Sequence, residues 1–187
     1  RTIDDMHSMI CSFYQYLIDM QLASRNPAAP VKVKYKSPRM QILEQAEVRR
    51  FLASLQGEWL EFFFYLAIHT GMREGELFGL RWSDVKLPQA AISVQTQIQW
   101  LYDPDRPETR SRYVFQSVKT DGSDRRVAIG PAAVDRLLAQ QRRLTVQRLV
   151  MGDKWDELDL VFPNNLGRPL EPSNVSRSLH RFLKRAG

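Results

Sequence analysis

The segment that most constrains the fold is residues 59–69, WLEFFFYLAIH, which is apolar on nearly every side and is interrupted only by Glu61. A helix that is apolar all round is typical of the buried centre of a domain. Gly71 follows, where glycine can end a helix because it adopts the left-handed conformation at little cost. The other elements must therefore pack around this helix. We expect its aromatic side chains to lie in the core: Trp59, Phe62, Phe63, Phe64 and Tyr65.

The composition narrows the class of protein. With 187 residues and 43% hydrophobic side chains the chain can bury a real core, which excludes wholesale disorder. The 27 Lys and Arg against 21 Asp and Glu leave a net charge of +6, which favours a polyanionic partner. Cys11 is the single cysteine and the three histidines are scattered, so we expect no disulfide and no metal site.

No membrane or secretion signal is recognisable in the sequence. The apolar run at residues 59–68 is too short to span a bilayer, and Arg1 leads into Asp4 and Asp5 without an apolar segment behind them. We therefore expect a cytoplasmic protein with no membrane partner that faces DNA or RNA.

Residues 1–22 are predicted to form an amphipathic helix. Its apolar side chains recur at three- and four-residue steps and lie on one stripe. A lone helix cannot shield such a stripe from water, and no helix-start signal precedes Arg1, so we expect the chain to begin inside a larger helical unit. The stripe consists of Met6, Met9, Ile10, Phe13, Leu17 and Met20.

A basic, proline-bounded stretch follows at residues 30–39 and predicts a linker between two units. It has four positive charges and no negative ones. One interpretation is a solvated linker. The other is a strap along DNA phosphates, where each positive side chain displaces a counterion. The charged residues are Lys32, Lys34, Lys36 and Arg39.

The rest of the chain predicts an α+β fold, mainly helical with a small three-stranded antiparallel sheet. Three segments alternate apolar and polar side chains, as half-buried strands do. An Asp-Gly pair at residues 121–122 is a strong hairpin signal between the second and third strands. The predicted helices are residues 43–55, 73 onward, 131–150 and 173–185, and the predicted strands are residues 91–98, 113–118 and 126–129.

Arg73 is the main candidate for binding an anion. It comes just after Gly71, at a tight turn near the positive end of the next predicted helix, where guanidinium and backbone donors together suit a phosphate. Glu76, one turn on, is placed to hold this arginine or a neighbouring backbone group. The alternative is an ordinary surface arginine paired with Glu74 or Glu76.

The segment TGMREGELFGLRWSDV, residues 70–85, resembles the first arginine motif of the tyrosine recombinases, the phage integrase family. Further segments match that family in order. SVKT followed by RRVAI resembles its catalytic lysine on a β-hairpin, and LVFP followed by GRPL and SNV resembles the approach to its later catalytic boxes. The opening helix with Asn26, Pro27 and Ala28 resembles the last helix of its core-binding domain. The resemblance covers nearly the whole chain.

The resemblance implies a domain organisation and a chemistry. Residues 1–28 would be the last helix of a helical core-binding domain, residues 29–40 an interdomain linker, and residues 41–187 the N-terminal portion of the catalytic domain. Such recombinases break and rejoin DNA through a 3′-phosphotyrosyl intermediate, without a metal or cofactor. Arg73 would clamp the scissile phosphate.

The same resemblance assigns the remaining site residues. Lys119 would protonate the departing 5′ oxygen, although a solvated hairpin lysine is the alternative. Glu76 and Asp84 would be structural supports. The partners would be double-stranded DNA and further copies of the full-length protein in a synaptic multimer. The final helix would approach a DNA groove through Asn174 and Arg177, whereas the simpler interpretation of its start is that Ser173 caps it.

The sequence also departs from the family pattern. The His-x-x-Arg box and the nucleophilic tyrosine that follows it are not found, and the residue three after His180 is Leu183 instead of arginine. We therefore expect this chain alone not to cleave DNA. Three hypotheses follow: part of a recombinase, a non-catalytic DNA-binding module that keeps the fold, or a helical interaction domain with incidental basic charge.

Overall fold

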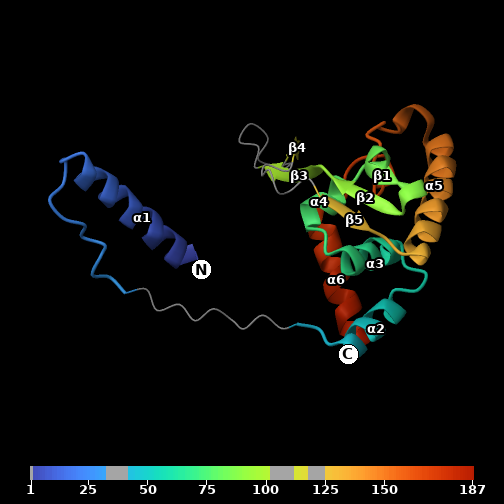
Figure 1. Cartoon of the computed structure of the whole chain (residues 1–187), viewed down its shortest axis with the longest axis horizontal. Coiled ribbons are helices and arrows are strands. Elements are labelled where there is room, and N and C mark those ends of the chain that lie inside the picture. The colour runs from blue at the N-terminus through green and yellow to red at the C-terminus, as the bar shows by residue number, and fades with distance from the viewer. Residues whose placement is uncertain (1, 33–41, 102–111, 118–124) are drawn as a thin grey trace. The chain divides into compact units, whose positions relative to one another are not determined.

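The computed structural model describes residues 2–32, 42–101, 112–117 and 125–187 (Figure 1). The chain divides into two compact units, Arg1–Leu43 and Glu44–Gly187. Among the described residues, no helix is both long and apolar enough to cross a membrane.

In the described part of the first unit, residues 2–32 and 42–43, the helix is α1 (Thr2–Asp19), which confirms the predicted opening helix. The segment after it folds back along the helix. The side chain of Asn26 donates to the carbonyl of Cys11 (3.3 Å), and His7 Nε2 lies 2.9 Å from the carbonyl oxygen of Ala28. Most of the apolar stripe stays exposed within this unit, including Met6, Met9, Ile10, Phe13 and Met20.

The second unit holds the remaining helices, and each predicted helix is present with slightly different ends. The ends differ because capping and packing, more than periodicity, decide the terminal turns. Ser173 does not cap the last helix, because Glu171 occupies the cap position and Pro172 is the first helical residue. The helices are α2 (Gln45–Ser54), α3 (Glu61–Thr70), α4 (Glu74–Phe78), α5 (Pro131–Met151) and α6 (Pro172–Ala186).

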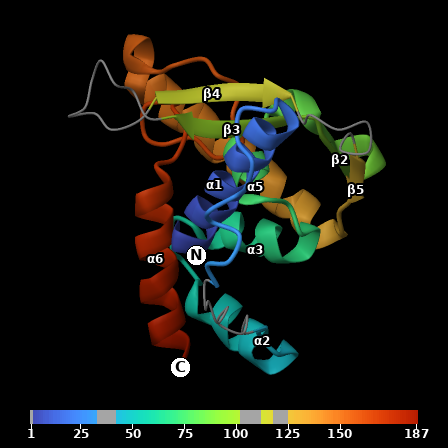
Figure 2. The same cartoon turned by 90° about the vertical axis from the view of Figure 1, so that its left-hand side faces the viewer.

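The strands form two antiparallel sheets, a three-stranded one in the order β1-β2-β5 and a two-stranded one of β3 and β4. Ile92 lies opposite Val127 in the first sheet, and Ile98 lies opposite Phe115 in the second. Figure 2 shows β3 and β4 side by side. The strands are β1 (Val85–Lys86), β2 (Ala91–Val94), β3 (Thr96–Leu101), β4 (Arg112–Ser117) and β5 (Arg125–Ala128).

This pairing corrects two strand predictions. The segment expected as one strand over residues 91–98 is divided at Gln95 into β2 and β3, which belong to different sheets. The predicted pairing of the second strand with the third is wrong, because β4 pairs with β3 and β5 with β2. Alternation of side chains identifies a strand but not its partner. The Asp-Gly pair lies outside the described residues.

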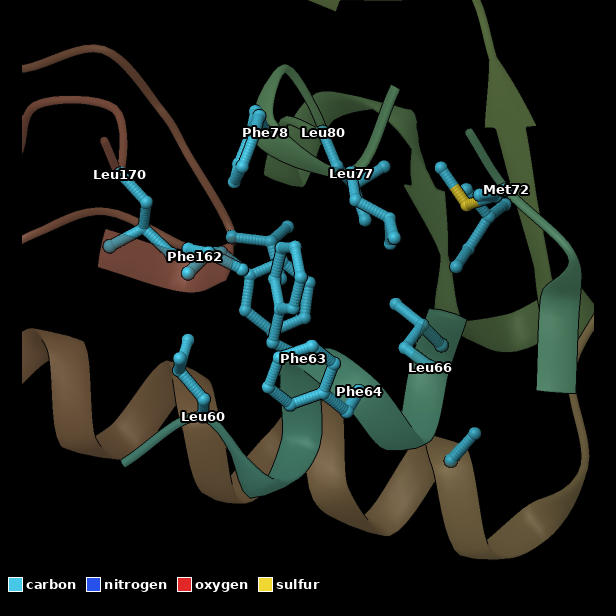
Figure 3. Close-up of a cluster of buried hydrophobic side chains, with 14 of the residues drawn as sticks. Leu60, Phe63, Phe64, Leu66, Met72, Leu77, Phe78, Leu80, Phe162 and Leu170 are labelled. Atoms are coloured by element: carbon cyan, nitrogen blue, oxygen red, sulfur yellow. The ribbon is translucent and has the colours of Figure 1, made fainter. Parts of the chain in front are cut away.

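Helix α3 contributes Phe63, Phe64 and Leu66 to the hydrophobic core, as its apolar sequence predicts, whereas Ile68 near its end is exposed (Figure 3). The Phe64 ring meets the Phe182 ring of α6 edge-on at 6.0 Å, and the Phe63 ring meets that of Phe162 at 5.3 Å. Trp59 does not belong to this core, contrary to expectation. It precedes the first turn of α3 and is 52% exposed.

Helix α4 approaches strand β3 so closely that Gly75 within the helix and Gly79 just after it leave little room for a side chain. A Cβ atom on Gly75 would lie 2.8 Å from the carbonyl oxygen of Ile98, and one on Gly79 would lie 3.0 Å from the Gln97 carbonyl carbon. Because both neighbours are backbone atoms, they cannot move aside as a flexible side chain can. This contact holds α4, and with it Arg73, against the β3–β4 sheet.

Candidate functional site

The site begins at the tight turn that leads from α3 into α4. Thr70 Oγ1 donates to the carbonyl oxygen of Leu66 at 2.6 Å and accepts from the Met72 N–H at 3.4 Å. Gly71 adopts the left-handed conformation (φ 61°) and donates its N–H to the carbonyl oxygen of Ala67 at 3.0 Å. These contacts end α3 as predicted and bring Arg73 to the position before α4.

Glu76 is the buried centre of the site, with no exposed surface. Its Oε2 accepts the backbone N–H of Arg73 at 2.7 Å, and its Oε1 lies 3.4 Å from Nη1 of the same arginine. The Arg73 side chain is nonetheless 71% exposed. An ion pair that long and that exposed contributes about 0–1 kcal/mol. The backbone of Arg73 is therefore held in place while its guanidinium keeps most of its donors available.

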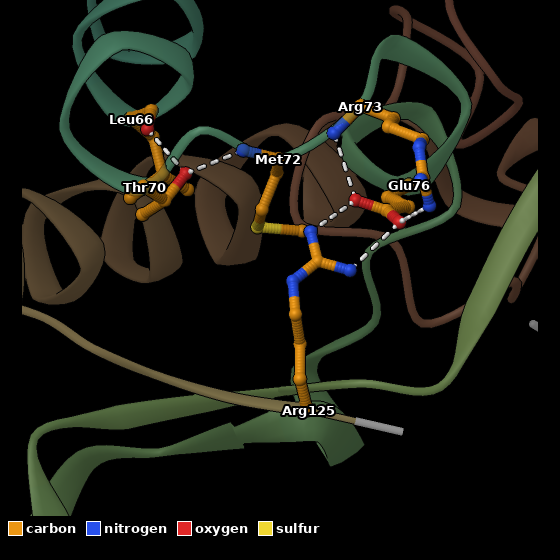
Figure 4. A network of polar contacts seen from close by, with 6 residues as sticks. All are labelled: Leu66, Thr70, Met72, Arg73, Glu76 and Arg125. Atoms are coloured by element: carbon orange, nitrogen blue, oxygen red, sulfur yellow. Dashed lines mark hydrogen bonds and ion pairs between the residues drawn. The ribbon is translucent and has the colours of Figure 1, made fainter. Parts of the chain in front are cut away.

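Arg125, the first residue of β5, is the site residue that sequence reasoning missed. Its Nη1 and Nη2 donate to the two carboxylate oxygens of Glu76 at 3.0 and 2.8 Å, a bidentate pair (Figure 4). The only signal in the sequence is strand alternation, which turns Arg125 to the opposite face from Arg126. Nothing in that alternation indicates a carboxylate partner in α4.

The electrostatics of this cluster follow from burial and hydrogen bonding. Burial alone would raise the pKa of Glu76. The hydrogen bonds from Arg125 and from the Arg73 N–H outweigh it, so the pKa lies below its usual value and the carboxylate stays ionised. In the same way, the hydrogen bond to Glu76 raises the pKa of Arg125.

Asp84, the second predicted support, lies in a short 3-10 turn (Trp82–Asp84) and is 8% exposed. Burial raises the pKa of its carboxyl, and a hydrogen bond from the Arg81 backbone opposes that shift in part. The groups that lower its pKa are thus Arg81 and Lys86, which are close to it in the chain, and Arg73 is not among them.

Asn174 and Arg177 lie together near the start of α6, with both side chains exposed. Arg177 Nη2 donates to Asn174 Oδ1 at 2.5 Å, and its Nε donates to the Ser173 carbonyl oxygen at 3.2 Å. They line an open hollow that we call the α6 surface. It consists of Trp59, Asn174, Arg177, Ser178 and Arg181.

The other candidates divide by location. Lys32 is exposed in the first unit. His180 is exposed, with Nδ1 2.8 Å from the Ser176 carbonyl oxygen. The remaining candidates lie outside the described residues: Lys34, Lys36, Arg39 and Lys119. Of the predicted residues, the structure therefore brings Arg73 together with Glu76 and brings Asn174 together with Arg177.

Comparison with known proteins identifies relatives along the whole chain. The chain is 26% identical over 198 residues to a XerC-like tyrosine recombinase of Caldanaerobacter subterraneus subsp. tengcongensis, covering 100% of the chain and 51% of that protein. It is 26% identical over 194 residues to an integrase of Streptomyces ambofaciens, covering 100% and 47%. The chain thus spans about half the length of these relatives.

Solved structures show the same fold. The Tn1549 transposon integrase in complex with a circular intermediate DNA matches with a TM-score of 0.73 and 18% identity, covering 98% of this chain and 58% of that one. A lambda integrase tetramer bound to a Holliday junction matches with a TM-score of 0.56 and 17% identity, covering 97% and 46%.

The sequence profile of the phage integrase family matches residues 41–187, which include the turn at Arg73, the sheets and α6. The predicted mixed fold, a mainly helical unit with a small three-stranded antiparallel sheet, is present. On this match, this fold and these relatives, the chain belongs to the phage integrase family, the tyrosine recombinases.

Proposed function

We propose that this chain is the DNA-binding part of a tyrosine-type site-specific recombinase, which in its full-length form breaks and rejoins DNA through a 3′-phosphotyrosyl intermediate. The observation that carries the proposal is the exposed guanidinium of Arg73, whose backbone is held by the buried carboxylate of Glu76. The named relatives are a recombinase and integrases, and two of the similar integrases were solved on DNA.

In this proposal Arg73 binds the non-bridging oxygens of the scissile phosphate and stabilises the charge that grows on them in the transition state. A tyrosine of the full-length protein attacks phosphorus, so an oxygen–phosphorus bond forms to the tyrosine and the bond to the 5′ oxygen breaks. Lys119 gives its proton to that leaving oxygen.

We further propose that residues 1–28 are the last helix of a core-binding domain and that residues 29–40 are a linker to the catalytic part at residues 41–187. The division into compact units between Leu43 and Glu44 supports this boundary, as does the start of the family match at residue 41. The partners in this proposal are double-stranded DNA and other copies of the full-length protein in a synaptic multimer. Its place of action is the cytoplasm.

Replacing Lys32, Lys34 and Lys36 together by glutamine tests whether the linker is a strap on DNA. Each lost phosphate contact should flatten the slope of log affinity against log salt by about 0.9. Binding to unrelated duplexes should weaken about equally, because phosphates carry no sequence information. Fluorescence anisotropy of labelled duplexes at several salt concentrations measures both effects.

The control for the linker variant is Lys154→Gln, which removes one exposed lysine of the second unit. It should leave the slope unchanged. A linker variant with the wild-type slope would reject the strap and favour the solvated linker.

Replacing Arg177 by glutamine tests the α6 surface. We expect DNA affinity to fall about tenfold, or about 1.4 kcal/mol, which is within the range for one direct arginine contact. The same anisotropy assay on several duplexes separates two kinds of contact. Equal losses on all duplexes indicate a phosphate contact, whereas a changed sequence preference indicates a base contact.

The matched control is Arg148→Gln, since Arg148 is an exposed arginine at the end of α5 that pairs with Glu157 at 2.6 Å. It should bind DNA as the wild type does. Unchanged affinity in Arg177→Gln would remove the α6 surface from the DNA interface.

A further inference from the structure

Glu76 is shared by two arginines, but unequally. Arg125 donates to both carboxylate oxygens, at 3.0 and 2.8 Å, whereas the Arg73 side chain reaches only Oε1, at 3.4 Å. The Arg125 side chain is 33% exposed, against 71% for that of Arg73. A bidentate pair with little exposure is stronger and better oriented than a single long contact in water. Of the two guanidinium groups, that of Arg125 therefore contributes more to the orientation of the Glu76 carboxylate.

A fully buried carboxylate needs a counterion, because an unpaired charge away from water is costly. Glu76 has only the two arginines as cationic partners among the described residues. Without Arg125, the guanidinium of Arg73 would be the remaining counterion and would be drawn inward to the carboxylate. With Arg125 in place, Glu76 is neutralised by a residue of β5 and still holds the Arg73 backbone through its N–H at 2.7 Å.

We propose that Arg125 is a positioning residue for Arg73: it serves as the dedicated counterion of Glu76 and so leaves the Arg73 guanidinium free to bind a DNA phosphate. This inference rests on the proposed function of Arg73. It also gives β5 a role beyond the sheet, since the first residue of that strand ties the sheet to the turn before α4 (Figure 4).

The test is a double-mutant cycle in the full-length protein, read as the rate of covalent protein–DNA complex formation on a suicide substrate. Arg125→Gln should slow this rate 10- to 100-fold and change DNA affinity less than twofold. In an Arg73→Lys background, Arg125→Gln should slow complex formation less than threefold further. The effects of two substitutions are not additive when one residue acts through the other. Arg125→Lys, which keeps the charge but not the bidentate fork, should lose only 3- to 10-fold.

Arg126→Gln is the matched control, because Arg126 is the next residue of β5, on the opposite and exposed face. Its rate should stay within twofold of the wild type. If Arg125→Gln does not fold, the double-mutant cycle is measured with Arg125→Lys instead, for which the expected loss of rate is 3- to 10-fold.

The outcomes separate the inference from the proposed function. A wild-type rate in Arg73→Lys alone would reject the role of Arg73, whatever Arg125 does. A slow Arg73→Lys with a wild-type rate in the Arg125 variants would overturn the inference. Equal slowing by Arg125→Gln in both backgrounds would also overturn it, because Arg125 would then act independently of Arg73.

Discussion

Replacing Arg73 or Lys119 by alanine in the full-length protein should slow covalent complex formation at least about a hundredfold while DNA affinity stays nearly unchanged. Removing one preorganised group that stabilises developing charge costs about 10²–10³ in rate. Binding rests on many phosphate contacts instead, so the loss of one cation has little effect on it. Trapping on a suicide substrate measures the rate, and anisotropy of the same duplex measures affinity.

Arg50→Ala is the control, since Arg50 is an exposed arginine of α2. It should form the covalent complex at the wild-type rate. Wild-type rates in both test variants would reject the assignments of Arg73 and Lys119. A full-length wild type that binds DNA but never forms the complex would favour the non-catalytic DNA-binding module.

Glu76→Gln should lower the free energy of unfolding of the 187-residue chain by about 3 kcal/mol. Removing one partner of a buried ion pair typically costs 3–5 kcal/mol, and the partial exposure of Arg125 favours the lower end. Urea unfolding should show a lower midpoint with an unchanged slope. The control is Glu61→Gln, whose partner Arg136 lies at 2.7 Å but whose pair is partly exposed, so it should cost less than about 1 kcal/mol. An equal loss of unfolding free energy in the two variants would contradict the conclusion that the buried Glu76 pair stabilises the fold more than the partly exposed Glu61 pair.

The same variant should show a distinct pH dependence. Because the folded-state pKa of Glu76 lies below its usual value near 4.5, the stability it contributes is fully present above that value and is lost as the pH falls through the folded-state pKa. The difference in unfolding free energy between wild type and Glu76→Gln should therefore shrink on acidification below about pH 4.5. A difference that is constant down to pH 2 would mean that the carboxylate is not the stabilising form.

The elements that could be predicted from the sequence are those whose cause is local. Gly71 ends α3 because glycine tolerates the left-handed turn, and Glu76 reaches the Arg73 N–H because one helical turn separates them. The apolar run of α3 predicts burial because the helix has no polar side to turn toward water. Trp59 shows the limit of that argument, because it precedes the helix and is exposed beside α6.

What the sequence by itself determined is the family resemblance, the helices and the turn at Gly71, and it offered Glu76 as a candidate support for Arg73 or for a neighbouring backbone group. Only the tertiary structure decided which strands pair and that Arg125, distant in the chain, is the main partner of the Glu76 carboxylate. The physical reason is that periodicity and capping act over a few residues. Strand partners and counterions are selected by packing across the whole unit, where a buried charge takes whichever opposite charge the fold brings to it.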